Sequence, residues 1–186
     1  MAKKMKRLAL LSAAGTVLLT ILYRRTGAGL LLSLAITCGT LAYHVWMRLL
    51  VGLGFSLGMR NRADYGKRWY QVGAREMALY ERLNVKRWKR GMPTYDQTLF
   101  DPRLHSWDEI AQATCRAELV HETIAVLSFL PIAGGIWFGE YPVFLATSVL
   151  AAGCDLLFVA MQRYNRQRIR RLLERESIRK QNRSER

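Results

Sequence analysis

Cysteine is scarce in this sequence, and the few cysteines do not form pairs. The three are Cys38, Cys115 and Cys154, and two of them lie within apolar runs. An odd number at these spacings builds neither a disulfide framework nor a zinc site. The cysteines therefore say nothing about an oxidising compartment. We expect Cys115 to be a packing residue, and an acyl thioester on it is the less favoured alternative.

Acidic residues are also few. The chain has 14 Asp and Glu against 29 Lys and Arg, a net charge of +15 and a pI near 10.4. Such a charge indicates either nucleic acid or an anionic membrane surface as partner. Hydrophobic residues make up 51% of the chain and are collected in blocks. A nucleic-acid binder does not need runs of about 20 apolar residues, which is the length that spans a bilayer. We therefore expect a membrane protein with no nucleic-acid partner, no internal repeat and no second soluble domain.

Four apolar blocks predict four membrane-spanning helices. They cover residues 8–22, 28–47, 124–138 and 143–161. The first block follows a basic stretch but has no clear small-x-small cleavage site, so we interpret it as a retained helix instead of a signal peptide. The helix of the third block should begin earlier, because Ser106 and Glu109 form a capping box. It would run from Trp107 into the apolar block, where Pro131 should kink or break it.

The basic residues predict the orientation of these helices. Lys and Arg are abundant in residues 59–116 and after residue 162, and the GEYP turn between the third and fourth blocks has none. Both termini should then be cytoplasmic, in a multi-pass protein of a cell membrane. The expected fold is all-α, a single membrane domain of residues 1–186 with two helical hairpins and a cytoplasmic interfacial helical layer. Its parts are an N-terminal hairpin (1–58), a basic interfacial segment (59–116), a second hairpin (117–161), and a basic C-terminal helix and tail (162–186).

The stretch RAELVHE places charged groups at the mouth of the third apolar block. Glu118 and His121 are three residues apart, so they lie on one side of a helix. A carboxylate beside an imidazole fixes its tautomer and raises its basicity, and such a pair can deprotonate a hydroxyl. The alternative is a helix end with solvated charges. A metal site is less favoured, because ExxH supplies two ligands and the other histidines lie far away in the sequence.

The stretch QRYNRQR follows the fourth block. Asp155, Gln162 and Arg166 share one helical stripe. An aspartate within a span indicates function and a partner, either Arg166 or an arginine of another helix. Arginine forks suit phosphate, so a phosphate-bearing donor could dock here. The alternative is that the arginines only hold the helix end at anionic headgroups. Upstream, VKRWK is typical of the lipid interface, with Trp88 at headgroup depth.

VKRWK, RAELVHE and QRYNRQR in this order resemble the glycosyl-4,4'-diaponeurosporenoate acyltransferase family of staphyloxanthin-type carotenoid synthesis, over roughly residues 60–175. That family consists of small bacterial membrane proteins that esterify a glucose hydroxyl of a glycosylated C30 carotenoid acid with a fatty acyl chain. Glu122 and Gln167 depart from its pattern, which has an aromatic residue and a proline there. The motif positions that carry over are Trp88, Lys89, Glu118, His121, Gln162, Arg163, Tyr164, Asn165, Arg166 and Arg168.

The resemblance implies an acyltransferase, and the predicted orientation places its site at the inner leaflet. We expect His121 to be the general base, oriented by Glu118, with Asn165 and Gln162 donating to the developing oxyanion. The co-substrate would be an acyl-CoA or acyl-carrier-protein thioester, with no metal or other cofactor. The acceptor would be a glycolipid or glycosyl-carotenoid. Donor and headgroup binding would fall to Arg163, Tyr164, Arg166, Arg168, Asp155, Trp88 and Lys89.

Two alternatives belong to other classes of protein. One is a metal-dependent lipid hydrolase or reductase that uses Glu118, His121 and Asp155. The other is a non-catalytic membrane scaffold for lipid-synthesis enzymes. The glycines at 52, 54 and 58 would permit close contact in a homodimer.

Overall fold

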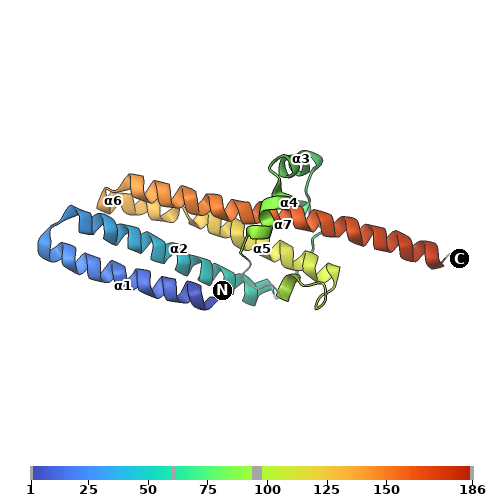
Figure 1. Cartoon of the computed structure of the whole chain (residues 1–186), viewed down its shortest axis with the longest axis horizontal. Helices are drawn as coiled ribbons and strands as arrows, with labels where there is room; N and C mark the ends of the chain where they lie inside the picture. Colours follow the sequence, from blue (N-terminus) through green and yellow to red (C-terminus); the bar gives the residue numbers. More distant parts are fainter. Residues whose placement is uncertain (1, 60–61, 94–97, 185–186) are drawn as a thin grey trace. The chain divides into compact units, whose positions relative to one another are not determined.

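The computed structural model describes residues 2–59, 62–93 and 98–184, and these contain helices and no strand (Figure 1). The all-α prediction is confirmed. The elements are α1 (Ala2–Thr26), α2 (Gly29–Met59), η1 (Arg68–Tyr70), α3 (Ala74–Arg82), α4 (Val85–Trp88), η2 (Lys89–Gly91), η3 (Thr98–Phe100), α5 (Trp107–Leu127), η4 (Leu130–Gly134), α6 (Gly135–Phe138) and α7 (Tyr141–Ser184).

Four helical stretches are long and apolar enough to cross a membrane, as the four apolar blocks predicted. They are Lys3–Thr26, Gly29–Met59, Trp107–Phe138 and Tyr141–Arg179. The fourth block and the basic C-terminal segment form one continuous helix, α7. No proline interrupts that run after its first turn, and a basic, helix-favouring sequence continues it beyond the apolar residues.

Local signals account for the boundaries of α5. The Ser106 backbone N–H donates to Glu109 Oε2 at 2.8 Å, and the Glu109 N–H donates to Ser106 Oγ at 3.3 Å, so the predicted capping box is confirmed. The helix ends at Leu127, and Pro131 lies in the first turn of η4, a separate 3₁₀ helix. The predicted break at Pro131 is therefore present. Gly139, with φ of 72°, then ends α6, and α7 begins two residues later.

The chain forms two compact units. The first is Met1–Gly54 with Glu122–Leu156. Within it, α1 and α2 lie side by side as a hairpin (Figure 1), joined at Gly27 with φ of 70°. The two helices are in contact at their glycines: a Cβ on Gly15 would lie 3.5 Å from Cys38 Sγ, and one on Gly39 would lie 3.5 Å from Thr16 Cγ2, both ordinary van der Waals distances.

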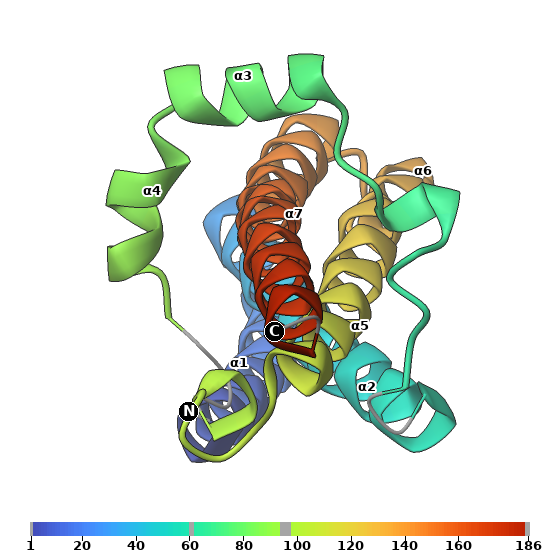
Figure 2. The same ribbon diagram turned by 90° about the vertical axis from the view of Figure 1, so that its right-hand side faces the viewer.

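The second unit is Phe55–His121 with Leu157–Arg186. Here α3 and α4 lie against α7 (Figure 2), through a cluster of Met77, Tyr80, Val85 and Tyr164. A second cluster joins α5 to α7, through Ile110, Ala111 and Ile169, with Tyr65, Phe100, Trp107 and Leu173 packed around it. This unit holds most of the residues to which the sequence assigned chemistry.

Candidate functional site

The centre of the second unit is an ionic network around Glu118 of α5. Glu118 is 0% exposed, and each of its carboxylate oxygens pairs with an arginine of α7. Arg163 Nη1 lies 2.5 Å from Oε1, and Arg166 Nη1 pairs with Oε2. A buried carboxylate is stable only when it is paired and hydrogen-bonded, and here two cations compensate it. The predicted catalytic Glu118 is therefore engaged by two residues that we expected to bind substrate.

Arg163 uses all five of its guanidinium N–H groups within the protein. Beyond Glu118, it donates from Nε and Nη2 to the two oxygens of Glu76 in α3, at 2.5 and 3.0 Å. Its Nη1 and Nη2 also donate to the backbone carbonyls of Trp69 and Gln71, at 3.0 and 3.1 Å. An arginine has five donors, so Arg163 has none left for a phosphate. Its expected role in binding a donor needs correction for this reason.

Arg166 is likewise enclosed. It is 0% exposed, and it donates from Nε and Nη2 to the Tyr70 carbonyl at 3.0 and 2.7 Å. Its guanidinium also lies over the Tyr70 ring, 5.1 Å from the centroid. With Nη1 paired to Glu118, the side chain fastens the segment before α3 to α7. The fork geometry that suggested phosphate recognition serves backbone carbonyls and a buried carboxylate instead.

The outer end of this network is Glu76. Burial alone would raise the pKa of Glu76, but hydrogen bonds from Arg163 and Tyr80 outweigh it and hold that pKa below its usual value. Tyr80 donates its hydroxyl to Glu76 Oε1 at 2.5 Å, and burial together with this bond raises the pKa of the phenol. Glu76 is thus a carboxylate and Tyr80 a neutral phenol at neutral pH. Together with Glu118, Arg163 and Arg166, the network carries two negative and two positive charges.

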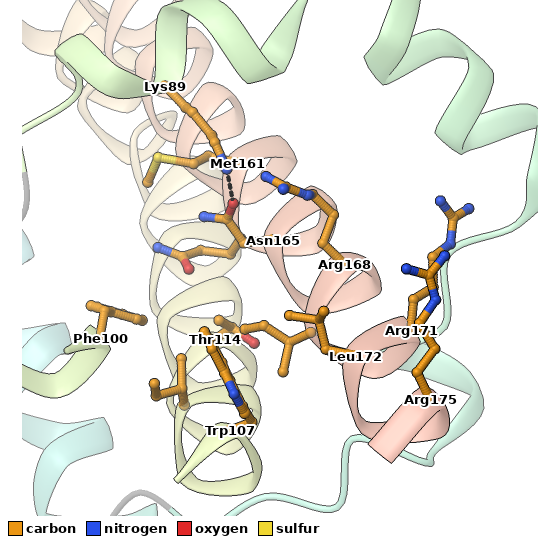
Figure 3. Close-up of a pocket in the computed structure, with 13 residues that line it drawn as sticks. Lys89, Phe100, Trp107, Thr114, Met161, Asn165, Arg168, Arg171, Leu172 and Arg175 are labelled. Carbon is orange, nitrogen blue, oxygen red and sulfur yellow. Dashed lines mark hydrogen bonds between the residues drawn. The ribbon is translucent and has the colours of Figure 1, made fainter. Parts of the chain in front are cut away.

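A groove of about 600 Å³ lies beside this network, between α5, α7 and the segments around Lys89 and Phe100 (Figure 3). One part of its wall is apolar and another is cationic, and none of the described residues that line it is acidic. Lys89, Arg168, Arg171 and Arg175 form the cationic part. The apolar part consists of Phe100, Trp107, Ile110, Met161, Ile169 and Leu172, and the polar uncharged residues are Thr114, Gln162 and Asn165.

The two predicted amides lie in this groove. Lys89 donates its ammonium to Asn165 Oδ1 (Figure 3), so the Asn165 amide N–H₂ group faces away from the lysine. Gln162 is 5% exposed, and its Oε1 has no hydrogen-bond partner among the described residues. A buried polar atom of this kind indicates a place where a ligand group can bind. Gln162, Asn165, Arg168 and Lys89 are the predicted site residues that the structure brings together in one groove.

His121 lies along the same two helices. It is half-buried, and its ring stacks on Phe158 with centroids 4.5 Å apart and planes 6° apart. Phe158 precedes Gln162 by four residues, about 6 Å along α7. On α5, His121 follows the groove residue Thr114 by seven residues, which is two turns on one face. The imidazole is therefore about one to two turns from the groove, on the side of the apolar halves of α5 and α7.

The other predicted residues have different surroundings. Tyr164 belongs to the α3–α4 core cluster, with the Lys89 ammonium 5.1 Å from its ring centroid. Trp88 packs against the same cluster and donates Nε1 to the Leu83 carbonyl at 3.1 Å. Asp155 lies in the first unit, 2% exposed, and pairs with Arg48 of α2. Of the two partners proposed for Asp155, an arginine of another helix is the one observed, and Arg166 pairs elsewhere.

No group of three or more His, Cys, Asp and Glu residues arranged as metal ligands occurs in the described part of the chain. Sequence reasoning missed several residues. Glu76 and Arg48 are single charges without a motif, and nothing local indicates their distant partners. Arg171 and Arg175 were placed only in the basic C-terminal helix and tail. A signal for them exists, because Arg168, Leu172 and Arg175 repeat at intervals of four and three and so share the groove-lining face of α7.

Comparison with known protein families identifies a match. A family model described as glycosyl-4,4'-diaponeurosporenoate acyltransferase matches residues 66–175, which is more than half of the chain. A search of curated proteins and a search of solved structures found nothing that matches. The matched range contains the whole ionic network and the whole groove, and it begins after α1 and α2. The family resemblance that the motifs indicated for roughly residues 60–175 is therefore confirmed over residues 66–175.

Proposed function

Because the chain belongs to the glycosyl-4,4'-diaponeurosporenoate acyltransferase family, we propose that it moves a fatty acyl group onto a hydroxyl of a glycosylated carotenoid or related glycolipid. The observation that carries this proposal is the groove, in which cations, amides and apolar side chains meet and the described lining residues include no carboxylate. An acyl donor with an anionic end and an apolar chain complements such a wall.

The donor we propose is a thioester of phosphopantetheine, as in an acyl-CoA or an acyl-carrier protein. Its phosphate would lie at Arg168, Arg171 and Arg175, which are exposed and line the groove. Its acyl chain would lie against the apolar wall around Trp107 and Leu172. Arg163, whose donors are all engaged, and Arg166, which is 0% exposed, would support this binding only indirectly.

In the reaction, the hydroxyl oxygen of the acceptor attacks the thioester carbonyl. The C–S bond breaks, the ester C–O bond forms, and the thiolate leaves. We propose that His121 takes the hydroxyl proton and passes it to the leaving sulfur. Its position one to two turns from the groove, towards the apolar halves of α5 and α7, suits an acceptor that approaches from the membrane.

The developing oxyanion needs a donor in the groove. The Asn165 amide N–H₂ suits this role, because Lys89 occupies the carbonyl oxygen and thereby sets which end of the amide is free to donate. Gln162 is the second amide, and its buried Oε1 suits an N–H or O–H of the donor or acceptor. Lys89 and Glu118 are then positioning residues: one orients Asn165, and the other holds the arginines that tie the segment before α3 to α7.

The distribution of basic residues supports a reaction at the inner leaflet. Groove and network residues belong to segments rich in Lys and Arg, which are typical of cytoplasmic regions. Both termini would be cytoplasmic in the cell membrane. The contacts do not support the metal-dependent alternative, because each carboxylate oxygen of Glu118 pairs with an arginine. The non-catalytic scaffold remains the alternative that an activity assay decides.

The test is acyl transfer by purified protein in lipid nanodiscs. A radiolabelled acyl-CoA and the matching acyl-carrier protein are each offered with a glucosyl-carotenoid or an alkyl glucoside. We expect a labelled ester, and a loss of about 100-fold or more in kcat for His121→Ala. His105→Ala is the matched control, since His105 lies at the surface beside Glu109. Equal activity of His121→Ala and wild type would refute the base, and no ester from folded wild type with either donor would refute the transferase.

A further inference from the structure

The first compact unit contains a second polar centre, between α2 and α7. Arg48 of α2 pairs with Asp155 of α7, and its Nη2 also lies 3.5 Å from the Ala151 carbonyl. Arg48 Nη1 donates to the carbonyl of His44, one turn earlier in its own helix, at 2.9 Å. Ionisable residues within a span are costly and usually functional. Arg48 and Asp155 compensate each other's charge. The burial of the uncharged polar groups near them, His44 and Ser148, is not explained by this pair.

Two contacts fix the register of α2 against α7. Ser33 Oγ donates to Glu140 Oε1 at 3.3 Å, and Arg48 donates to Asp155; both pairs are separated by 107 residues. The two helices therefore run parallel with a constant offset. At this offset, His44 is level with Ala151, and Ser148 lies about one turn nearer the helix N-termini. Helical side chains lean towards the N-terminus, which brings the His44 ring towards the level of Ser148.

His44 and Ser148 have polar atoms without a hydrogen-bond partner among the described residues. These atoms are both ring nitrogens of His44 and the hydroxyl of Ser148, and the two residues are 6% and 0% exposed. Other hydroxyl groups in the same helices have hydrogen-bond partners within their own helix. Thr40 and Thr147 donate to carbonyls of their own helices at 3.0 and 2.8 Å. Ser148 directly follows Thr147 and does not make such a bond.

We propose that His44 and Ser148 form a binding site for the hydroxyl group of a hydrophobic alcohol dissolved in the bilayer. A neutral imidazole offers one donor and one acceptor, and a hydroxyl offers the same pair. One ligand hydroxyl can therefore bond to His44 and Ser148 together, and its alkyl remainder suits the apolar spans. A charged headgroup suits the site poorly, because Arg48 and Asp155 already neutralise each other.

This site is separate from the proposed transferase reaction. Both His44 and Arg48 precede the residues that the family model matches. Neither His44 nor Ser148 lines the groove. The proposal therefore stands or falls independently of acyl transfer. A water molecule is the other source of the same hydroxyl chemistry, and the experiment separates the two.

The experiment uses full-length protein in phospholipid nanodiscs, with 1-hexadecanol as the probe. Its methyl ether, which accepts a hydrogen bond but donates none, is the matched comparison ligand. The chain has three histidines, so ¹⁵N-histidine labelling gives a simple NMR spectrum in which His44→Phe identifies the His44 signals. We expect the alcohol to move the His44 ring-nitrogen signals more than the ether does, because only the alcohol can donate one hydrogen bond and accept another at the same time. At about ten times its dissociation constant, the alcohol should raise Tm by about 4 °C.

Ser148→Ala and Thr147→Ala are adjacent substitutions that remove one hydroxyl each. Ser148→Ala should abolish the response of His44 to the alcohol, and Thr147→Ala should keep it. Ser148→Ala alone should not lower Tm, because it removes a buried unpaired group. The proposal is overturned if both variants respond alike. It is also overturned if the His44 signals show a hydrogen-bonded ring without the alcohol and do not move when it is added, which is the result expected for a bridging water.

Discussion

Glu118→Gln is the substitution that tests the ionic network most directly. Gln keeps the size of the side chain and removes the charge that compensates two arginines. Arg163 retains both oxygens of Glu76, but the guanidinium of Arg166, which is 0% exposed, loses its carboxylate partner. Breaking a buried pair by removing one partner costs about 3 kcal/mol or more. For a chain of this size, that lowers Tm by about 6–12 °C.

Thermal unfolding in a mild detergent, followed by circular dichroism, measures this cost. Glu174→Gln is the control, because Glu174 is an exposed partner of Arg170 at 3.9 Å and should change Tm by about 1–2 °C at most. Arg166→Met should cost less than Glu118→Gln, since Glu118 keeps Arg163. The double variant Glu118→Gln with Arg166→Met should recover much of the loss. If Glu118→Gln shifted Tm no more than Glu174→Gln, the network would not stabilise the fold.

Two further outcomes follow from the site. Asn165→Asp keeps the contact with Lys89 but removes the N–H₂ donor, so kcat should fall about 100-fold in the acyl-transfer assay with KM nearly unchanged. If Lys89→Met lowered kcat/KM by the same factor through a higher KM, that result would contradict the role of Lys89 in positioning Asn165. Glu76 has a pKa below its usual value in the folded state, so it stabilises the fold above about pH 4.3 and loses that effect as pH falls through the folded pKa. The difference in unfolding free energy between wild type and Glu76→Gln should therefore shrink between pH 6 and pH 3 in denaturant titrations, and a constant difference would contradict the pairing of Glu76 with Arg163.

The helical architecture was predictable because its signals are local. Blocks of apolar residues set the four spans, Ser106 and Glu109 set the start of α5, and Pro131 set its end. Each of these depends on residues within a few positions of one another. The continuity of α7 was missed because charge and hydropathy change sharply near residue 162, although the backbone has no reason to stop there.

The partners of charged residues were not predictable in the same way. Asp155 pairs with an arginine 107 positions away, and Arg163 pairs with Glu76 at a separation of 87. Helical periodicity can show that Asp155 and Arg166 share a stripe, but it cannot show which stripe another helix will cover. Such pairings depend on register between helices, which the order of motifs does not contain.

The QRYNRQR motif illustrates how one short sequence serves two purposes. Arg163 and Arg166 are three residues apart and face Glu118, whereas Gln162, Asn165 and Arg168 follow at the same interval on the next face and line the groove. Substitution on either face should lower the rate of acyl transfer. Only variants of the first face should also lower Tm, because only there is a buried charge left without its partner. Activity alone therefore cannot assign these residues, and the comparison of kcat with Tm for Asn165→Asp and Glu118→Gln can.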